Sequence, residues 1–308
     1  PWPVAIPLVG KVSSHRMTDR RFTPVVYTSM AMVAFAANSV LCRLALHDGA
    51  IDAATFSILR FVSGALMLLF VTLRVQGRVL PVGGSWTAAA ILAVYALPFA
   101  YSYTQLSAGT GALILFGCVQ VTMLVAALGS GERPHVMQWV GLVLALGGLV
   151  NLVFPGLTAP SPSAAILMAV AGVCWGLYSL QGRFTSNPLL QTTGNFVRVV
   201  PLIGAASLAV FPRVHVEPRG VVFAVASGAL ATGLGYVVWY AALRSLSAVR
   251  AAVVQLAVPL LAAGGGVLLL AEAVTVRLVL STVLVLGGIA MAIVGGRPSR
   301  READQSAA

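Results

Sequence analysis

Charged residues are scarce in this sequence of 308 residues. Asp and Glu number eight, Lys and Arg number nineteen, and together they make up 9% of the chain against a hydrophobic share of 59%. The mean hydropathy is +0.95. A soluble protein of this length needs far more polar residues to cover its core, whereas runs of roughly 20 apolar residues, each long enough to cross a bilayer, recur along the whole chain. The sequence therefore predicts a polytopic membrane protein.

Motifs of enzymes and metal sites are also missing. The three cysteines (Cys42, Cys118 and Cys174) lie inside apolar runs without metal-ligand spacing, and the four histidines lie in expected loops or tails. There is no HExxH, no GxSxG, no phosphate-binding GxxxxGK[ST] loop and no pair of acids within a span. We therefore expect no enzyme activity, no cofactor, no metal and no ATP hydrolysis by this chain.

The net charge of +11 does not indicate a nucleic-acid partner. The basic residues, eighteen Arg and the single Lys11, are scattered at the ends of apolar runs rather than clustered. Such scattering is typical of the charges that orient a membrane protein. The expected surroundings are membrane lipids, and the expected partner is a small-molecule substrate; the sequence leaves the oligomeric state open.

The chain contains two related halves. Leu106–Glu132 and Leu246–Glu272 both begin with Leu-Ser-Ala and end with Glu, 140 positions apart. The same offset places Arg43 on Arg183 and Leu146-Gly147-Gly148 on Leu286-Gly287-Gly288. One constant offset across separated segments indicates a duplicated membrane unit.

We predict an all-α membrane protein with ten transmembrane helices arranged as two inverted five-helix repeats. The expected spans are residues 24–45, 53–74, 86–105, 107–128, 136–154, 163–182, 189–211, 220–242, 246–270 and 275–295. This divides the chain into an N-terminal tail (1–23), a first repeat (24–154), an external Pro-rich loop (155–162), a second repeat (163–295) and a C-terminal tail (296–308). Because Met17 resembles a natural start, residues 1–16 are expected to be an added or over-long leader.

The orientation follows from the odd number of spans in each repeat and from the basic residues. A repeat of five spans must re-enter the membrane from the opposite side. If the N-terminus is cytoplasmic, the cytoplasmic side holds thirteen basic residues, and the other side holds four (Arg43, Arg213, Arg219 and Arg277). By the positive-inside rule, we expect a multi-pass protein of the bacterial inner membrane with both termini in the cytoplasm.

Two arginines lie deep inside expected spans, several residues from either end. Arg60 and Arg198 occupy nearly equivalent positions of the two repeats, 138 residues apart. Buried ionisable residues in a membrane mark functional sites by default, so each arginine is a candidate to bind a substrate carboxylate. The alternative is a structural arginine that binds backbone carbonyls, and the duplicated position favours this.

Acids and prolines supply candidates for gating. Glu132 and Glu272 end the fourth and ninth spans, where each can pair with Arg as a gate, carry protons, or act as an interfacial acid that caps the next helix. Pro98, Pro201 and Pro259 are predicted to kink their helices, and Pro98 and Pro259 are candidate flexing points. No acid lies near the centre of a span, which weighs against proton-driven export of cations.

Polar and aromatic side chains inside the spans are the candidates for a substrate site. Their polar atoms need partners within the bundle or water in a cavity; interhelical bonds and interfacial aromatic belts are the alternative for each one. The predicted cavity residues are Asn38, Tyr95, Tyr101, Gln120, Trp175, Tyr178, Tyr236, Trp239 and Gln255.

The chain resembles the EamA-type members of the drug/metabolite transporter superfamily. The resemblance rests on Asn38–Arg43, Ile58–Gly64, Leu106–Glu132, Trp175–Arg183 and Leu246–Glu272, and it covers residues 24–295. It implies secondary transport, commonly efflux, of small metabolites including amino acids, through a central cavity between the halves. Phe35 replaces the tryptophan that is often found in the first span of this family.

We therefore expect a transporter that exports small metabolites, most of all amino acids, by alternating access. A carrier of drugs, sugar phosphates or nucleotide sugars is the alternative, although a phosphorylated substrate calls for more basic residues than Arg60 and Arg198. A membrane enzyme or a lipid-binding scaffold fits less well, because a catalytic constellation is missing and the chain is duplicated.

Overall fold

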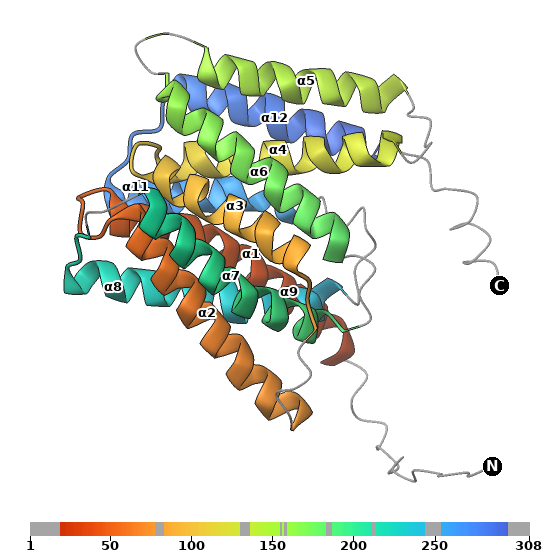
Figure 1. Ribbon diagram of the computed structural model, residues 1–308. Coiled ribbons are helices and arrows are strands. Elements are labelled where there is room, and N and C mark those ends of the chain that lie inside the picture. Colours follow the sequence, from red (N-terminus) through yellow and green to blue (C-terminus); the bar gives the residue numbers. More distant parts are fainter. Residues whose placement is uncertain are drawn as a thin grey trace, which may run out of the picture.

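The computed structural model describes residues 19–77, 83–129, 136–154, 156, 159–182, 187–210, 214–243 and 254–294. These residues are almost entirely helical, which confirms the predicted all-α class, and the helices run side by side as long rods (Figure 1). The terminal residues 1–18 and 295–308, and Glu132 among the candidate site residues, lie outside the described part.

The helices follow the expected spans in order, and the eighth span is divided among three consecutive elements. Their bounds are α1 Asp19–Leu46, α2 Ala53–Gln76, α3 Trp86–Tyr103, α4 Ala108–Gly129, α5 Val136–Val153, α6 Pro162–Gly182, α7 Pro188–Val210, α8 Pro218–Val225, the π-helix η1 Ala226–Leu234, α9 Gly235–Leu243, α11 Ala257–Leu270 and α12 Val276–Val294. Residues 246–253 of the expected ninth span lie outside the described residues.

Six helices of the described part are long and apolar enough to cross a membrane. They are α1, α2, α3, α5, α6 and the continuous rod formed by α8, η1 and the start of α9. Three shorter apolar helices accompany them: Ala108–Met123, Ala257–Leu270 and Val276–Ala292. The first half of α7 carries polar residues that lower its hydropathy, among them Gln191, Asn195 and Arg198.

The two halves of the chain are packed against each other throughout. α3 packs on α6, and the corresponding elements of the other half, α9 and α1, pack in the same way. α2 packs on α7, α4 on α11 and α5 on α12, so each of these helices meets its own counterpart from the other half. In Figure 1, α5 and α12 form one edge of the bundle and α2 lies at the opposite edge.

Local sequence sets the ends of several helices. The Asp52 carboxylate accepts a hydrogen bond from Thr55 N at 2.8 Å and caps α2. The Ser85 hydroxyl does the same for α3 through Ala88 N. These side chains satisfy backbone N–H groups that a helix start leaves without partners. Gly77 ends α2 with a positive φ of 66°, a conformation that costs glycine little.

The prolines act in two ways. Pro98 and Pro201 lie inside α3 and α7, as predicted. Pro259, expected inside a helix, instead lies in the first turn of α11, where a missing N–H costs no intrahelical bond. The helix is interrupted at Leu256. A proline clashes with the carbonyl four residues earlier, here that of Gln255, so a break before α11 replaces the expected kink.

A π-helix within the eighth span was not expected from the sequence. It covers Ala226–Leu234 between α8 and α9, and π-helical segments within α-helices are frequently found at functional sites. Gly228 in η1 lies against α2: a Cβ there would stand 2.0 Å from the Arg60 carbonyl oxygen and 2.1 Å from Ser63 Oγ. The backbones of η1 and α2 are therefore in direct contact next to Arg60.

Of the two consecutive glycines of α12, Gly287 and Gly288, the second lies in the contact with α5. A Cβ on Gly288 would lie 2.5 Å from the Gly141 carbonyl oxygen, whereas one on Gly287 meets nothing within 4 Å. Overpacking a close contact costs about 1–3 kcal/mol. We expect Gly288→Val to lower the unfolding temperature of the purified protein in detergent by several degrees, and Gly287→Val to leave it near wild type. Equal effects of the two variants would contradict this packing.

Candidate functional site

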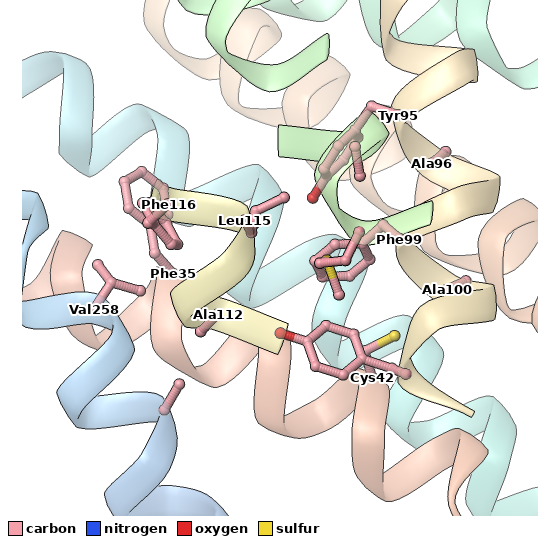
Figure 2. Close-up of a cluster of buried hydrophobic side chains, with 14 of the residues drawn as sticks. Phe35, Cys42, Tyr95, Ala96, Phe99, Ala100, Ala112, Leu115, Phe116 and Val258 are labelled. Carbon is pink, nitrogen blue, oxygen red and sulfur yellow. The ribbon is translucent and has the colours of Figure 1, made fainter. Parts of the chain in front are cut away.

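A small cavity lies where helices from both halves meet. Its lining residues come from α1, α2, α3, α4, α6, η1 and α9: Phe35, Asn38, Ser39, Arg60, Tyr95, Leu115, Phe116, Trp175, Ala231, Thr232 and Tyr236. Figure 2 shows part of this region, with Phe35 and Phe116 on one side of Leu115 and Tyr95 and Phe99 on the other. The cavity is thus mostly apolar, with a few polar groups.

Five of the eleven lining residues are aromatic and form one wall of the cavity. The ring centroid of Trp175 lies 5.5 Å from that of Tyr95, 5.2 Å from that of Tyr236 and 5.7 Å from that of Tyr178. Phe35 meets Tyr236 edge-on at 6.0 Å. These rings come from α1, α3, α6 and α9, so the cluster spans both halves. A substrate in the cavity would have to separate these rings.

A chain of polar contacts crosses the cavity. Ser227 Oγ donates to Asn38 Oδ1 at 2.8 Å, and Thr232 Oγ1 donates to the same oxygen at 3.4 Å. Arg60 Nε in turn donates to Thr232 Oγ1 at 3.4 Å, and Arg60 Nη2 donates to Tyr95 Oη at 3.1 Å. The contacts tie α1, α2 and α3 to η1, which gives the π-helix a role in holding the cavity residues.

Arg60 is a buried charge without an acidic partner among the described residues. The residue is 2% exposed, and its guanidinium carbon lies 4.8–5.5 Å from the ring centroids of Phe61, Tyr95 and Phe99. The ion pairs of the described part of the chain do not include Arg60. The guanidinium is therefore held by aromatic faces and hydroxyl oxygens, and it borders the cavity.

Arg198, in the equivalent position of the second repeat, has a different environment. Its Nη1 donates to the carbonyl oxygens of Gly83 at 2.7 Å and of Gly194 at 2.9 Å. Its guanidinium lies 5.9 Å from the ring of Trp86. Asn195 and Gln191 of α7 accept hydrogen bonds from the same loop, at Ser85 N and Gly84 N. Arg198 thus fastens the start of α3 to α7, and it does not line the cavity.

Glu272 joins three elements at one end of the bundle. Its Oε1 accepts from Arg43 Nε at 3.1 Å, and its Oε2 accepts from Ala108 N, the first residue of α4, at 2.8 Å. Arg43 Nη1 donates to the carbonyl oxygens of Tyr103 at 2.9 Å and Thr104 at 3.1 Å, at the end of α3. We call the Arg43–Glu272 pair with these backbone partners the clasp.

The clasp differs from the cap that the sequence suggested. Glu272 does not cap the next helix, α12, whose first turn is held by Thr275 Oγ1 accepting from Leu278 N. It caps α4, which is far away in the sequence, and Arg43 satisfies the carboxyl end of α3. Gly266 makes room for the carboxylate, because a Cβ there would lie 2.2 Å from Glu272 Oε2.

The structure brings some of the predicted cavity residues together and not others. Asn38, Tyr95, Trp175 and Tyr236 line the cavity. Tyr178 and Trp239 pack behind lining residues: Tyr178 contacts Trp175, and Trp239 contacts Phe35. Tyr101, Gln120 and Gln255 are not lining residues. Their predicted binding role, like that of the four at the cavity, stays a prediction.

Sequence reasoning missed about half of the lining. The missed residues are Phe35, Ser39, Leu115, Phe116, Ala231 and Thr232. Ser39 is adjacent to Asn38, and Thr232 is a polar residue in a span of small residues, so both gave a weak signal. Phe35 falls on Trp175 at the repeat offset of 140, which was also a signal, whereas Leu115, Phe116 and Ala231 gave none. Gln120 lies one turn beyond Phe116 on α4, and its buried amide nitrogen has no hydrogen-bond acceptor among the described residues.

Several known proteins are similar to this chain. An uncharacterized Pseudomonas aeruginosa protein is 49% identical over 290 residues, which are 93% of this chain and 100% of that protein. A probable amino-acid metabolite efflux pump of Escherichia coli is 23% identical, with 88% of this chain and 95% of the pump covered. An uncharacterized transporter of Bacillus subtilis is 24% identical, with 82% and 90% covered.

The fold is also found among solved structures. One crystal structure matches with a TM-score of 0.66 at 19% identity and covers 90% of this chain and 100% of its own. At that identity the match supports the fold alone. The sequence pattern of the EamA-like transporter family matches this chain twice, at residues 23–154 and 162–294, in agreement with the duplication seen in the sequence. The chain therefore belongs to the EamA-like transporter family.

Proposed function

We propose that this protein is a secondary transporter that exports small metabolites, most of all amino acids, by alternating access through the cavity between the two repeats. The observation that carries the proposal is the position of the cavity. Its aromatic wall and its polar groups come from both halves of a duplicated transporter chain. A rocking motion of one repeat against the other would open such a cavity to either side.

The proposal includes ten spans in two inverted repeats. The packing of helices on their own counterparts, such as α2 on α7 and α5 on α12, supports a two-fold relation between the halves. Because each unit has an odd number of helices, the second unit enters the membrane from the opposite side and is inverted relative to the first. The ends of α1 and the starts of α8 and α12 lie on the same side in Figure 1, and they carry Arg43, Arg219 and Arg277. This is the side that the charge count assigns to the exterior.

The orientation predicts which side of the membrane each loop faces. In a variant whose native cysteines are replaced by serine, Ser161→Cys should react with an impermeant thiol reagent added to intact cells, because both termini are proposed to be cytoplasmic. Gln76→Cys, at the end of α2 that is proposed to face the cytoplasm, should react only after lysis. The reverse pattern would overturn the orientation.

Amino acids fit the chemistry of the cavity. A zwitterion brings its own countercharge and needs no buried acid. Arg60 and Asn38 offer polar contacts at one side, and the rings of Tyr95, Trp175 and Tyr236 offer apolar surface for a side chain. The relative named as a probable amino-acid metabolite efflux pump supports the same substrate class.

The alternatives fit less well. A hydrophobic cation lacks a carboxylate partner among the described lining residues, and burying an unpaired charge is costly. A sugar phosphate or nucleotide sugar carries two or more negative charges, whereas the lining as described offers one guanidinium. An enzyme would need a reactive group in the cavity, and the lining offers neither a nucleophile paired with a base nor a metal ligand set.

A flux assay tests the proposal. Purified protein in vesicles should exchange labelled amino acids, and a panel of the twenty amino acids, a sugar phosphate and a hydrophobic cation should be compared with and without a pH gradient. Vesicles that move the cation or the sugar phosphate but no amino acid would contradict the substrate class. Vesicles that move nothing from the panel would contradict transport of these compounds altogether.

A further inference from the structure

We propose that Arg60 binds the carboxylate of the substrate and that the cavity selects compounds with a net charge of −1, such as N-acylated or deaminated amino acids with an aromatic body, over zwitterions and cations of the same size. This inference rests on the proposed function and narrows its substrate class: free amino acids still enter the same site through their carboxylate, but derivatives without the ammonium charge are expected to bind more tightly. The starting observation is that Arg60 is the one charged residue among the described lining residues of the cavity.

The first support is the lack of a countercharge for Arg60 in the described structure. A guanidinium removed from water is costly unless it is paired, and Arg60 is almost completely buried. Its hydrogen-bond acceptors are the neutral oxygens of Tyr95 and Thr232. A substrate carboxylate in the cavity would supply the missing charge, and an arginine fork binds a carboxylate with two parallel hydrogen bonds.

The second support is that two other arginines of the described structure, Arg43 and Arg198, already have partners. Arg43 is paired with Glu272, and Arg198 binds the carbonyl oxygens of Gly83 and Gly194. Arg60 differs from both because it borders a cavity. The position that the two repeats share is therefore structural in α7 and faces the substrate space in α2.

The third support concerns the ammonium group of a zwitterion. The described lining contains no Asp or Glu, so an ammonium would have only ring faces and neutral oxygens as partners. The face of Tyr95 is already close to Arg60, whose charge repels a second cation. Capping the nitrogen with an acyl group removes this repulsion, and the aromatic wall accommodates the added apolar atoms.

A set of matched ligands tests the charge preference on the unaltered protein. The compounds are N-acetyl-L-phenylalanine, its amide, L-phenylalanine and phenethylamine, and binding to the full chain in detergent is followed by tryptophan fluorescence. A hydrogen-bonded charge pair corresponds to about tenfold or more in affinity. We expect N-acetyl-L-phenylalanine to bind at least about tenfold tighter than its amide, with phenylalanine weaker than the acetylated acid and phenethylamine weakest. Equal binding of the acid and the amide, or tighter binding of phenethylamine, would overturn the inference.

Two variants locate the preference at Arg60. Arg60→Gln should reduce the difference between acid and amide to less than about twofold, and Arg60→Lys should keep part of it because the charge remains without the fork. An unchanged preference in a folded Arg60→Gln protein overturns the role of Arg60. If vesicles transport phenylalanine but the protein binds N-acetyl-L-phenylalanine and its amide equally well, this inference is overturned and the proposed function stands. Acid preference without flux of any acid overturns the proposed function instead.

Discussion

Replacing both Trp175 and Tyr236 by alanine is expected to reduce transport by about 100-fold and to leave the helices assembled. Trp175 contacts the rings of Tyr95, Tyr178 and Tyr236 at centroid distances of 5.2–5.7 Å, and it is the centre of the cavity wall. Pairs of this kind contribute about 0.5–1.5 kcal/mol each beyond the buried area. A substrate with an aromatic body that packs on both rings would gain two pairs of the same kind, and losing them costs up to roughly 3 kcal/mol, which corresponds to about 100-fold.

The fold is expected to survive this change because the two rings border the cavity. Trp175 is partly exposed, and Tyr236 is buried but also lines the cavity, so removing the two rings enlarges an existing space and does not create a separate void. The measurement is amino-acid flux in vesicles together with the unfolding temperature of the purified protein. Trp139→Ala with Tyr27→Ala is the matched control, since it removes the same residue types from exposed positions on α5 and α1. An equal loss of transport in both variants would contradict the role of the wall.

Much of the fold could be predicted from the sequence. The constant offset of 140 identified the duplication, and apolar runs with short breaks fixed the order of the helices. The π-helix at Ala226–Leu234 could not be predicted. Its Gly228 lies against the backbone of α2, which is more than 150 residues away in the sequence. Local propensity carries no information on such a contact.

The cavity could be predicted only in part. Depth in the membrane follows from counting along a span, but the rotation of a nearly all-apolar helix about its axis does not. Tyr95 faces the cavity and Tyr101 does not, although both lie on α3. The difference between Arg60 and Arg198 was equally hidden, because their repeat positions are nearly the same and only their partners from distant elements differ.

The clasp has a functional meaning if the protein works by alternating access. Arg43 and Glu272 connect α1, the end of α3, the start of α4 and the end of α11, and their side chains are 11% and 13% exposed. We propose that the clasp holds this end of the cavity closed and must break for the cavity to open there. Cys42, next to Arg43 and buried in the structure, then reports on the opening.

Breaking the clasp should open this end. In protein that carries Cys118→Ser and Cys174→Ser, we expect Glu272→Gln to raise the rate at which an impermeant thiol reagent labels Cys42 by at least about tenfold. Removing one partner of a buried pair costs about 3–5 kcal/mol, and even half of the lower value shifts an opening equilibrium about tenfold. Labelling at the unchanged rate would exclude the clasp as a gate. Export should fall at the same time, since the closed state is no longer held.

Exchanging the two charges separates the clasp from a simple ion pair. Arg43→Glu with Glu272→Arg restores opposite charges, and an ion pair alone would regain its function. The clasp would not, because Arg43 also donates to the carbonyl oxygens of Tyr103 and Thr104, and Glu272 also accepts from Ala108 N. After the exchange a carboxylate faces carbonyl oxygens and a guanidinium faces a backbone N–H, both repulsive. We therefore expect the exchanged protein to label as fast as Glu272→Gln, and recovery of slow labelling would mean that the charge pair alone closes this end of the cavity.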